Sequence, residues 1–192
     1  MKKITMTLAI AALSLVSFAQ NWKMDPAHTK ITFKTKYLVI SDVEGQFKTF
    51  EGTFTSSKAD WTDLNATATI QVSSITTDNE MRDKHLISDD FFNAEKFPTI
   101  TFKSKGIKML DKNKYILSGD LTIRDVTKSV ELPFVYGGTV KDPWGNIKAG
   151  FKATGQINRK DYNLKYSSAA ATGEAVVSDI VEFNIDAVLI KQ

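Results

Sequence analysis

Hydrophobic and polar residues alternate with a period of two along most of this chain, which is the pattern of β-strands with one buried and one exposed face. Within residues 28–37, for example, Ile31, Phe33, Thr35 and Tyr37 share one face, and lysines occupy three of the positions between and before them. Alternating segments of this kind cover residues 28–37, 43–55, 66–73, 99–109, 115–124, 129–140, 147–158 and 179–190. Eight long strands predict an antiparallel barrel, which at this strand number either fills with side chains or encloses one small ligand. An immunoglobulin-type sandwich is the alternative fold, although its strands are usually shorter.

The side chains predicted to face the barrel interior combine large aromatic residues with alanine and glycine. Ala66 and Ala68 stand at inward positions where a solid core would favour leucine, and Gly119 and Gly155 stand at others. Such a mixture leaves room along the barrel axis. We therefore expect a barrel that is partly hollow and closed at one end.

Residues 77–97 interrupt the alternation and are predicted to form a short helical segment at one end of the barrel. Thr77 and Glu80 have the spacing of a capping box, in which each side chain satisfies an amide of the other residue. Asp78 and Arg82 are four residues apart with the acid first, which is the favourable order for an ion pair on a helix.

Residues 1–19 have the three parts of a secretory signal peptide. Lys2 and Lys3 provide the positive charge, residues 8–16 the apolar stretch, and a small-x-small sequence ending at Ala19 the cleavage site. The apolar stretch is shorter than the ~20 residues that a membrane-spanning helix needs. We therefore expect cleavage near Ala19 and a periplasmic protein, with full secretion as the alternative.

The remaining residues, 20–192, are enough for one domain with a full core and too few for two. The whole chain has 25 basic and 22 acidic residues, and its formal net charge of +3 falls by two, to +1, without Lys2 and Lys3. This balance argues against nucleic acid as a partner. The chain has no cysteine, so neither a disulfide nor a lipid-modified cysteine can form, and we expect no stable membrane anchor.

The sequence lacks the motifs of the common enzyme classes. With no cysteine and only His28 and His85, a zinc site with Cys/His spacing cannot be built. No Gly-x-Ser-x-Gly, P-loop or Gly-x-Gly-x-x-Gly motif occurs, so acyl transfer and nucleotide chemistry have no signature. We therefore expect a protein that is not an enzyme and that has no catalytic residue, metal site or cofactor.

Several short motifs follow one another along the chain in an order that is specific to one family. The motifs are Met24-Asp25-Pro26-Ala27-His28-Thr29, Val43-x-Gly45-x-Phe47, Ser74-Ile75-x-Thr77, Arg82-Asp83-x-His85-Leu86, Asp90-Phe91-Phe92, Phe97-Pro98-Thr99-Ile100, Gly119-Asp120-Leu121-Thr122-Ile123, Val126-Thr127-Lys128 and Trp144-Gly145. Together they resemble the YceI-like family of secreted lipocalin-like proteins, and the resemblance covers nearly all of residues 20–192.

The resemblance implies an eight-stranded antiparallel lipocalin-like barrel with a helix-bearing segment at one end. It also implies that the protein binds an isoprenoid chain, such as that of an isoprenoid quinone or a polyprenyl carrier, with fatty acids or their amides as the alternative. Family members commonly have a histidine at the end of the first long strand, where this chain has Tyr37. A phenol keeps a donor and an acceptor but does not titrate near neutral pH, so the head group of the ligand stays open.

The predicted ligand-binding residues are inward-facing apolar side chains of the strands together with a group near the helical segment. The candidates on the strands are Ile31, Phe33, Phe47, Ile70, Phe102, Leu121, Phe134 and Phe151. For each phenylalanine, ordinary core packing is the alternative role.

Phe91, Phe92 and Phe97 are predicted to form the mouth of the cavity. Arg82 or His85 is predicted to meet a polar head group there, and Tyr37 is a further candidate. For Arg82, the alternative is the ion pair with Asp78.

Three functions from different classes are compatible with these features. A module that binds or carries a long-chain apolar lipid is favoured. An enzyme acting on a quinone or a lipid would need a polar cluster inside the barrel, and an interaction protein would have a filled barrel. An extended barrel with an exposed edge could also pair as a homodimer.

Overall fold

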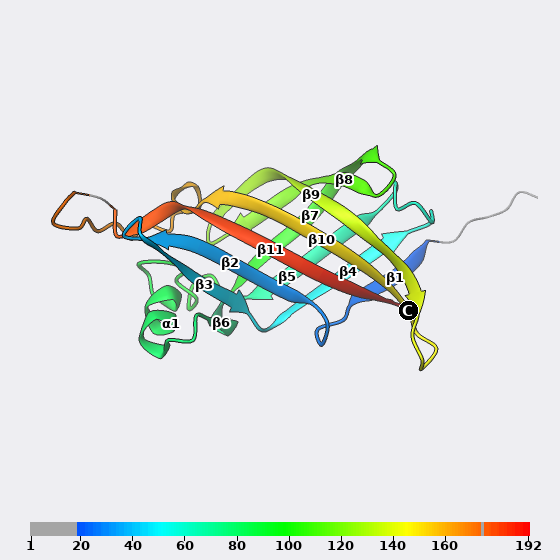
Figure 1. The fold of residues 1–192 in the computed structure, drawn as a ribbon, viewed down its shortest axis with the longest axis horizontal. Helices are drawn as coiled ribbons and strands as arrows, with labels where there is room; N and C mark the ends of the chain where they lie inside the picture. The colour runs from blue at the N-terminus through cyan, green and yellow to red at the C-terminus, as the bar shows by residue number, and fades with distance from the viewer. Residues whose placement is uncertain (1–18, 174) are drawn as a thin grey trace, which may run out of the picture.

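The alternating segments form the strands of an antiparallel barrel in the computed structural model, which describes residues 19–173 and 175–192 (Figure 1). The strands are β1 (Gln20–Met24), β2 (Lys30–Tyr37), β3 (Ser41–Phe47), β4 (Phe50–Ser56), β5 (Asn65–Gln71), β6 (Ile75–Thr76), β7 (Thr99–Asp111), β8 (Lys114–Ile123), β9 (Val126–Lys141), β10 (Ile147–Asn158) and β11 (Val177–Lys191). The predicted signal peptide, apart from Ala19, lies outside the described residues.

Eight of these strands close into a ring in the order β1, β4, β5, β7, β8, β9, β10 and β11, and β1 returns to β11. Trp22 of β1 lies opposite Phe54 of β4 on one side and Lys191 of β11 on the other. Three further strands lengthen the wall at one end. There β11 pairs with β2 instead of β1, β2 pairs with β3, and β3 pairs with β6. The expected eight-stranded antiparallel barrel is confirmed.

The second predicted strand, residues 43–55, is divided into β3 and β4. At the break, the backbone N–H of Lys48 donates to the carbonyl oxygen of Ser74 at 3.1 Å, and that of Thr49 donates to Ser74 Oγ at 3.0 Å. Ser74 belongs to a 3₁₀ turn, Val72–Ser74, that separates β5 from β6. The backbone at Lys48 and Thr49 therefore bonds to this turn, and the predicted strand does not continue as one strand.

The helical insertion lies at the end of the barrel where the β2–β3 hairpin also ends (Figure 1). Its helix, α1, covers Glu80–Ile87, and turns lead from there to the start of β7. The N-cap is Asn79, whose side-chain oxygen accepts from the backbone N–H of Arg82 at 3.0 Å. The prediction of a capping box starting at Thr77 is therefore wrong.

Thr77 bonds to side chains of α1 instead. Its hydroxyl donates to Asp83 Oδ1 at 2.6 Å and accepts from Nε of Arg82 at 2.7 Å. Arg82 Nη2 also donates to the carbonyl oxygen of Thr77 at 2.7 Å. Arg82 thus bonds to Thr77 rather than forming the predicted pair with Asp78.

The opposite end of the barrel, called the closed end below, is filled by an aromatic cluster. Its members are Trp22, Trp61, Tyr115, Phe134, Tyr136 and Phe151. Trp61 comes from the loop between β4 and β5, and its ring centroid lies 5.0 Å from that of Trp22 and 4.9 Å from that of Phe151. Tyr115 stacks on Phe134 at 4.9 Å, and its hydroxyl donates to the carbonyl oxygen of Asp60 at 2.7 Å. This cluster closes one end of the barrel, as the sequence predicted.

Candidate ligand cavity

A cavity of about 490 Å³ lies inside the barrel, between the aromatic cluster and α1. Side chains from ten of the strands form its wall, and most of them are apolar. Its volume falls in the range of roughly 300–1,000 Å³ that is usual for pockets that bind small molecules. Such pockets are mainly apolar with a few polar groups that fix orientation, and this cavity follows that pattern.

Thirteen of the fourteen predicted ligand-binding residues line this cavity. They are Ile31, Phe33, Tyr37, Phe47, Ile70, Arg82, His85, Phe91, Phe92, Phe102, Leu121, Phe134 and Phe151. The period-two alternation placed the strand residues correctly because each strand has only two faces.

Phe97 is the exception, because it is not among the residues that line the cavity. The guanidinium of Arg124 lies 5.4 Å from the Phe97 ring centroid and the ammonium of Lys96 lies 5.3 Å from it. A ring this close to two cations gains a cation–π attraction. Phe97 thus supports the turn that follows α1 rather than the cavity wall.

Pairs of phenylalanine and glycine explain how an aromatic interior stays hollow. Phe33 lies opposite Gly45 on the neighbouring strand, and Phe183 lies opposite Gly155. A Cβ atom at Gly45 would stand 2.3 Å from Phe33 Cζ, and one at Gly155 would stand 2.4 Å from Phe183 Cζ. Each ring therefore lies over a glycine, along the wall, and leaves the axis of the barrel free.

Sequence reasoning missed two groups of lining residues. On the strands it did not select Val181, Phe183, Ile185 and Leu189 of β11, although their alternation contained the signal. Arg159, Leu164 and Tyr166 also line the cavity, and they come from the irregular stretch after β10, where no periodicity exists to indicate a face.

Arg159 fastens the segment that borders the cavity at the α1 end. Only 3% of this residue is exposed, and its guanidinium donates to the carbonyl oxygens of Leu164, Tyr166, Val177 and Ser178 and to the carboxylate of Asp179. Burial lowers the pKa of Arg159, while Asp179 and Tyr166 act in the opposite direction. The side chain stays charged, since an arginine does not lose its proton in proteins. Its donors are engaged with protein, so Arg159 positions the wall of the cavity.

His85 and Arg82 lie on α1 and face the same end of the cavity. Nε2 of His85 lies 2.9 Å from Asp90 Oδ2, and its ring meets those of Phe91 and Tyr166 edge-on at 5.1 and 5.0 Å. Phe91 in turn stacks on Tyr166 at 4.9 Å. Arg82 uses two of its donors on Thr77, and among the described residues its remaining donors meet no protein acceptor.

The polar side chains that line the cavity, which include Thr32, Thr35 and Thr101, can all donate hydrogen bonds. The ionisable residues of the lining are Lys36, Tyr37, Arg82, His85, Arg159 and Tyr166, and among the described lining residues there is no carboxylate. Tyr37 remains 40% exposed, so the cavity reaches the surface beside it. We call the part of the cavity lined by Tyr37, Val43, Arg82, His85, Tyr166, Val176 and Val177 the mouth.

Arg124 ties two segments of the mouth together. It lies in the β8–β9 turn, and its Nη1 donates to the carbonyl oxygens of Asp89, Phe91 and Asn163 at 3.1, 2.7 and 2.8 Å. The first two belong to the turn after α1, and the third follows β10. The mouth is thus held by two arginines, Arg124 and Arg159, from outside the helix.

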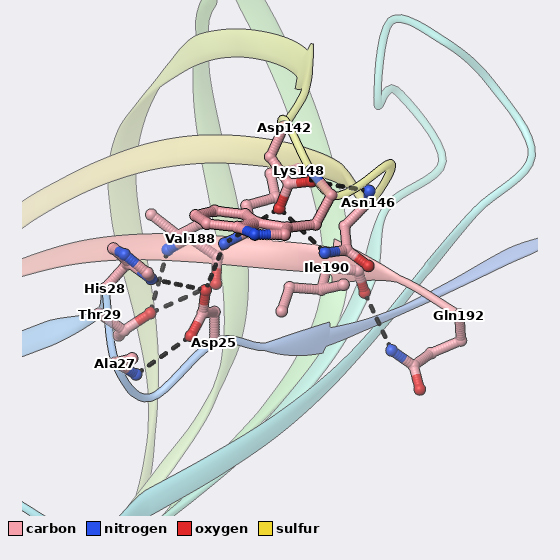
Figure 2. A network of polar contacts seen from close by, with 11 residues as sticks. Asp25, Ala27, His28, Thr29, Asp142, Asn146, Lys148, Val188, Ile190 and Gln192 are labelled. Carbon is pink, nitrogen blue, oxygen red and sulfur yellow. Dashed lines mark hydrogen bonds and ion pairs between the residues drawn. The ribbon is translucent and has the colours of Figure 1, made fainter.

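A polar network on the outer side of the barrel, near the closed end, is built around Asp25 (Figure 2). The ammonium of Lys148 and Nδ1 of His28 lie 3.0 and 2.8 Å from Asp25 Oδ2, and the N–H of Ala27 donates to Oδ1 at 3.1 Å. Burial alone would raise the pKa of Asp25, but the hydrogen bonds from Lys148, His28 and Ala27 outweigh it and hold this pKa below its usual value. The network fastens the β1–β2 turn to β10, and none of its residues lines the cavity, so we assign it a structural role.

Within residues 19–173 and 175–192, no group of three or more acidic, histidine or cysteine side chains is placed to hold a metal ion. No helix in the same part of the chain is long and apolar enough to cross a membrane.

Comparison with known proteins gives a consistent match. The family model of the YceI-like domain matches residues 22–189. The protein YceI of Escherichia coli O157:H7 is 37% identical over 179 residues, which cover 91% of this chain and 93% of that protein.

Two solved structures share the fold. BcnA of Burkholderia cenocepacia is similar with a TM-score of 0.75 at 25% identity, over 86% of this chain and 98% of that chain. A structure described as a polyisoprenoid binding domain from Saccharophagus degradans has a TM-score of 0.64, over 89% of this chain and 98% of that one. Its identity is 15%, so this likeness concerns the fold.

Proposed function

The chain belongs to the YceI-like domain family, and on this premise we propose that it is a lipid-binding protein that holds an isoprenoid chain inside the barrel. The observation that supports the proposal best is the apolar cavity of about 490 Å³. The description of the Saccharophagus degradans relative as a polyisoprenoid binding domain agrees with it.

The cavity is large enough for a substantial part of such a chain. An apolar cavity of roughly 150 Å³ accepts benzene, so a cavity of about 490 Å³ accommodates about twenty carbon atoms, or four isoprene units. At about 0.8 kcal/mol per buried CH₂, twenty carbons contribute on the order of 15 kcal/mol. Association costs roughly 4–15 kcal/mol, so the hydrocarbon alone can supply the affinity.

The mouth suits a head group that accepts hydrogen bonds. Arg82, His85 and Tyr37 present donors there, and a quinone carbonyl or a phosphate oxygen is an acceptor. A fatty acid or its amide is the second candidate ligand, because its oxygen would meet the same donors.

We propose a periplasmic location, or secretion, after cleavage near Ala19. A long isoprenoid chain cannot cross an aqueous compartment alone. Carriage across such a compartment would explain why a protein encloses the isoprenoid in a barrel. Storage or sensing of the lipid would use the same cavity. A homodimer would not be needed for any of these roles.

Extraction of the purified protein into organic solvent, followed by mass spectrometry, tests the proposal. We expect a polyprenyl compound in the extract of the wild-type protein. A protein that yields no long-chain lipid, even after incubation with an isoprenoid quinone, would refute it, and a fatty acid or amide would favour the second candidate.

A matched pair of variants on β10 assigns the lipid to the cavity. Ala153 lines the cavity, while the next residue, Thr154, is exposed on the outer face. We expect Ala153→Trp to fill part of the cavity and to reduce the bound lipid at least several-fold. Thr154→Trp should leave the lipid content unchanged, because its side chain points away from the cavity. Equal lipid content in the two variants would place the lipid elsewhere on the protein.

A further inference from the structure

The turn between β2 and β3 has a backbone conformation that its residue types rarely adopt. The N–H of Ile40 donates to the carbonyl oxygen of Tyr37 at 3.2 Å, and the two residues between them, Leu38 and Val39, have φ angles of 49° and 65°. A hairpin turn with two positive φ angles is of the I′ kind, which Asn-Gly forms with least strain. A β-branched residue such as Val39 rarely adopts this conformation.

The same turn is apolar and exposed. Val39 is 65% exposed and Ile40 is 85% exposed, so both side chains extend into solvent. In water, Asn-Gly would relieve the strain and also remove the exposed apolar surface. This turn has neither the residues that suit its backbone nor the polar side chains that suit an exposed position. Its composition therefore indicates an apolar environment that these side chains can enter. We call Leu38, Val39 and Ile40 the apolar turn.

The apolar turn adjoins the mouth of the cavity. Tyr37, directly before it, lines the cavity, and the N–H of Leu38 donates to the carbonyl oxygen of Val176, another lining residue, at 3.0 Å. Figure 1 shows the β2–β3 turn at the same end of the barrel as α1. On α1, Met81 is 82% exposed.

Charged residues begin directly behind the turn. Lys36 and Asp42, opposite each other on β2 and β3, form an ion pair of 2.8 Å, and Lys34 pairs with Glu182 at 3.2 Å. At about 3.3 Å per residue, the apolar turn extends roughly 7 Å beyond the first of these pairs. This matches the depth of about 5–10 Å to which apolar side chains enter the headgroup boundary of a bilayer.

We propose that the apolar turn inserts into the surface of a lipid bilayer and holds the mouth against it, so that a lipid chain passes between bilayer and cavity without entering water. The proposal rests on the proposed lipid-binding function, since the ligand explains why the mouth would face a bilayer. It requires reversible contact only, not an anchor.

The β9–β10 turn at the closed end provides a matched control. Trp144 in that turn is 82% exposed and therefore offers an apolar side chain of at least equal size. There the positive φ of 93° falls on Gly145, and Asp142 accepts from the backbone N–H groups of Trp144 and Asn146 at 3.0 and 2.8 Å. This turn is therefore unstrained, and the cavity does not reach it.

Sedimentation with vesicles of phosphatidylethanolamine and phosphatidylglycerol tests the proposal. We expect the wild-type protein and Trp144→Glu to bind these vesicles. The double variant Val39→Glu with Ile40→Glu should bind about tenfold more weakly or less, and it should transfer an isoprenoid quinone between vesicles more slowly by a similar factor.

A second variant separates docking from folding. Leu38→Asn with Val39→Gly should raise Tm by about 2–4 °C, because it relieves the turn, and should nevertheless weaken vesicle binding. If this variant and the double glutamate variant bind vesicles as the wild type does, the proposal is overturned. It is also overturned if the glutamates instead convert a dimer to a monomer in light scattering, because the turn would then contact a second copy.

Lipid extraction from the same preparations keeps the two proposals apart. Variants of the apolar turn should retain the lipid content of the wild type, because none of the three residues lines the cavity. Loss of vesicle binding with unchanged lipid content therefore supports docking. If the wild type contains lipid but the turn variants bind vesicles as well as the wild type does, docking is refuted. The proposed lipid-binding function is then unaffected.

Discussion

The two ends of this barrel are built from the same alternating strands, yet one is filled and the other is open. At the closed end, the loop between β4 and β5 inserts Trp61 and Leu64, which are 3% and 7% exposed, among side chains of the strands. At the mouth, α1 and the segment after β10 lie along the rim, held there by Arg124 and Arg159. The strands set the diameter, and the connecting segments decide whether an end is filled.

This comparison assigns different tasks to the two ends. The closed end gains stability from aromatic rings in mutual contact. The mouth orders its segments through hydrogen bonds from the buried guanidinium groups of Arg124 and Arg159. Changes at the closed end should therefore mainly affect folding, and changes at the mouth should mainly affect retention of the ligand.

The largest effect is expected from Trp61→Ala. Removing a buried tryptophan costs about 3–5 kcal/mol, because the transfer free energy is lost and a void is left between Trp22 and Phe151. For a domain of this size the loss corresponds to a fall in Tm of roughly 10 °C. Thermal denaturation by circular dichroism measures it, and lipid content at low temperature should be close to that of the wild type. A Tm within a degree or two of the wild type would contradict the assignment of stability to this end.

A smaller loss of stability and a larger loss of ligand retention are expected from Arg159→Met. The change leaves several carbonyl oxygens, among them those of Leu164 and Tyr166, without their donors, which costs about 3 kcal/mol. Because Leu164 lines the cavity and Tyr166 borders the mouth, bound lipid should exchange into vesicles several-fold faster, as measured with a fluorescent quinone analogue.

The neighbouring Lys160→Met serves as the control. Lys160 pairs with Asp179 at 3.0 Å at the surface, where an ion pair contributes between nothing and about 1 kcal/mol. Equal exchange rates in the Arg159 and Lys160 variants would show that the rim segment does not control the mouth.

The barrel and the lining of its strands could be predicted from the sequence, and the rim could not. Alternation is a local signal, and it assigned Phe33, Phe102 and Phe151 to the interior correctly. The position of Arg159 depends on acceptors up to twenty residues away that come together only in the folded chain. No local pattern encodes such a set of carbonyl oxygens.

The helix cap was mispredicted for a related reason. Thr77 and Asn79 are both good capping residues, and the local sequence does not choose between them. In the folded protein Asp83 and Arg82 occupy the hydroxyl of Thr77, so Asn79 caps the helix. The sequence predicts Phe97 at the mouth together with Phe91 and Phe92, whereas Arg124 from the distant β8–β9 hairpin lies against its ring.

The smallest effect on stability, and the most direct test of why the barrel is hollow, is expected from Gly155→Ala on β10. The added methyl would stand 2.4 Å from the end of the Phe183 ring, so the ring must turn away from the wall and into the cavity. We expect a cost of about 1 kcal/mol, typical of a modest overpacking, together with a clear reduction in bound lipid. Gly150→Ala on the same strand is the matched control, because no atom lies within 4 Å of its added methyl. If the two variants hold equal amounts of lipid, the rings lying over glycines do not determine the space, and the hollow interior must instead follow from the small residues Ala68 and Ala153.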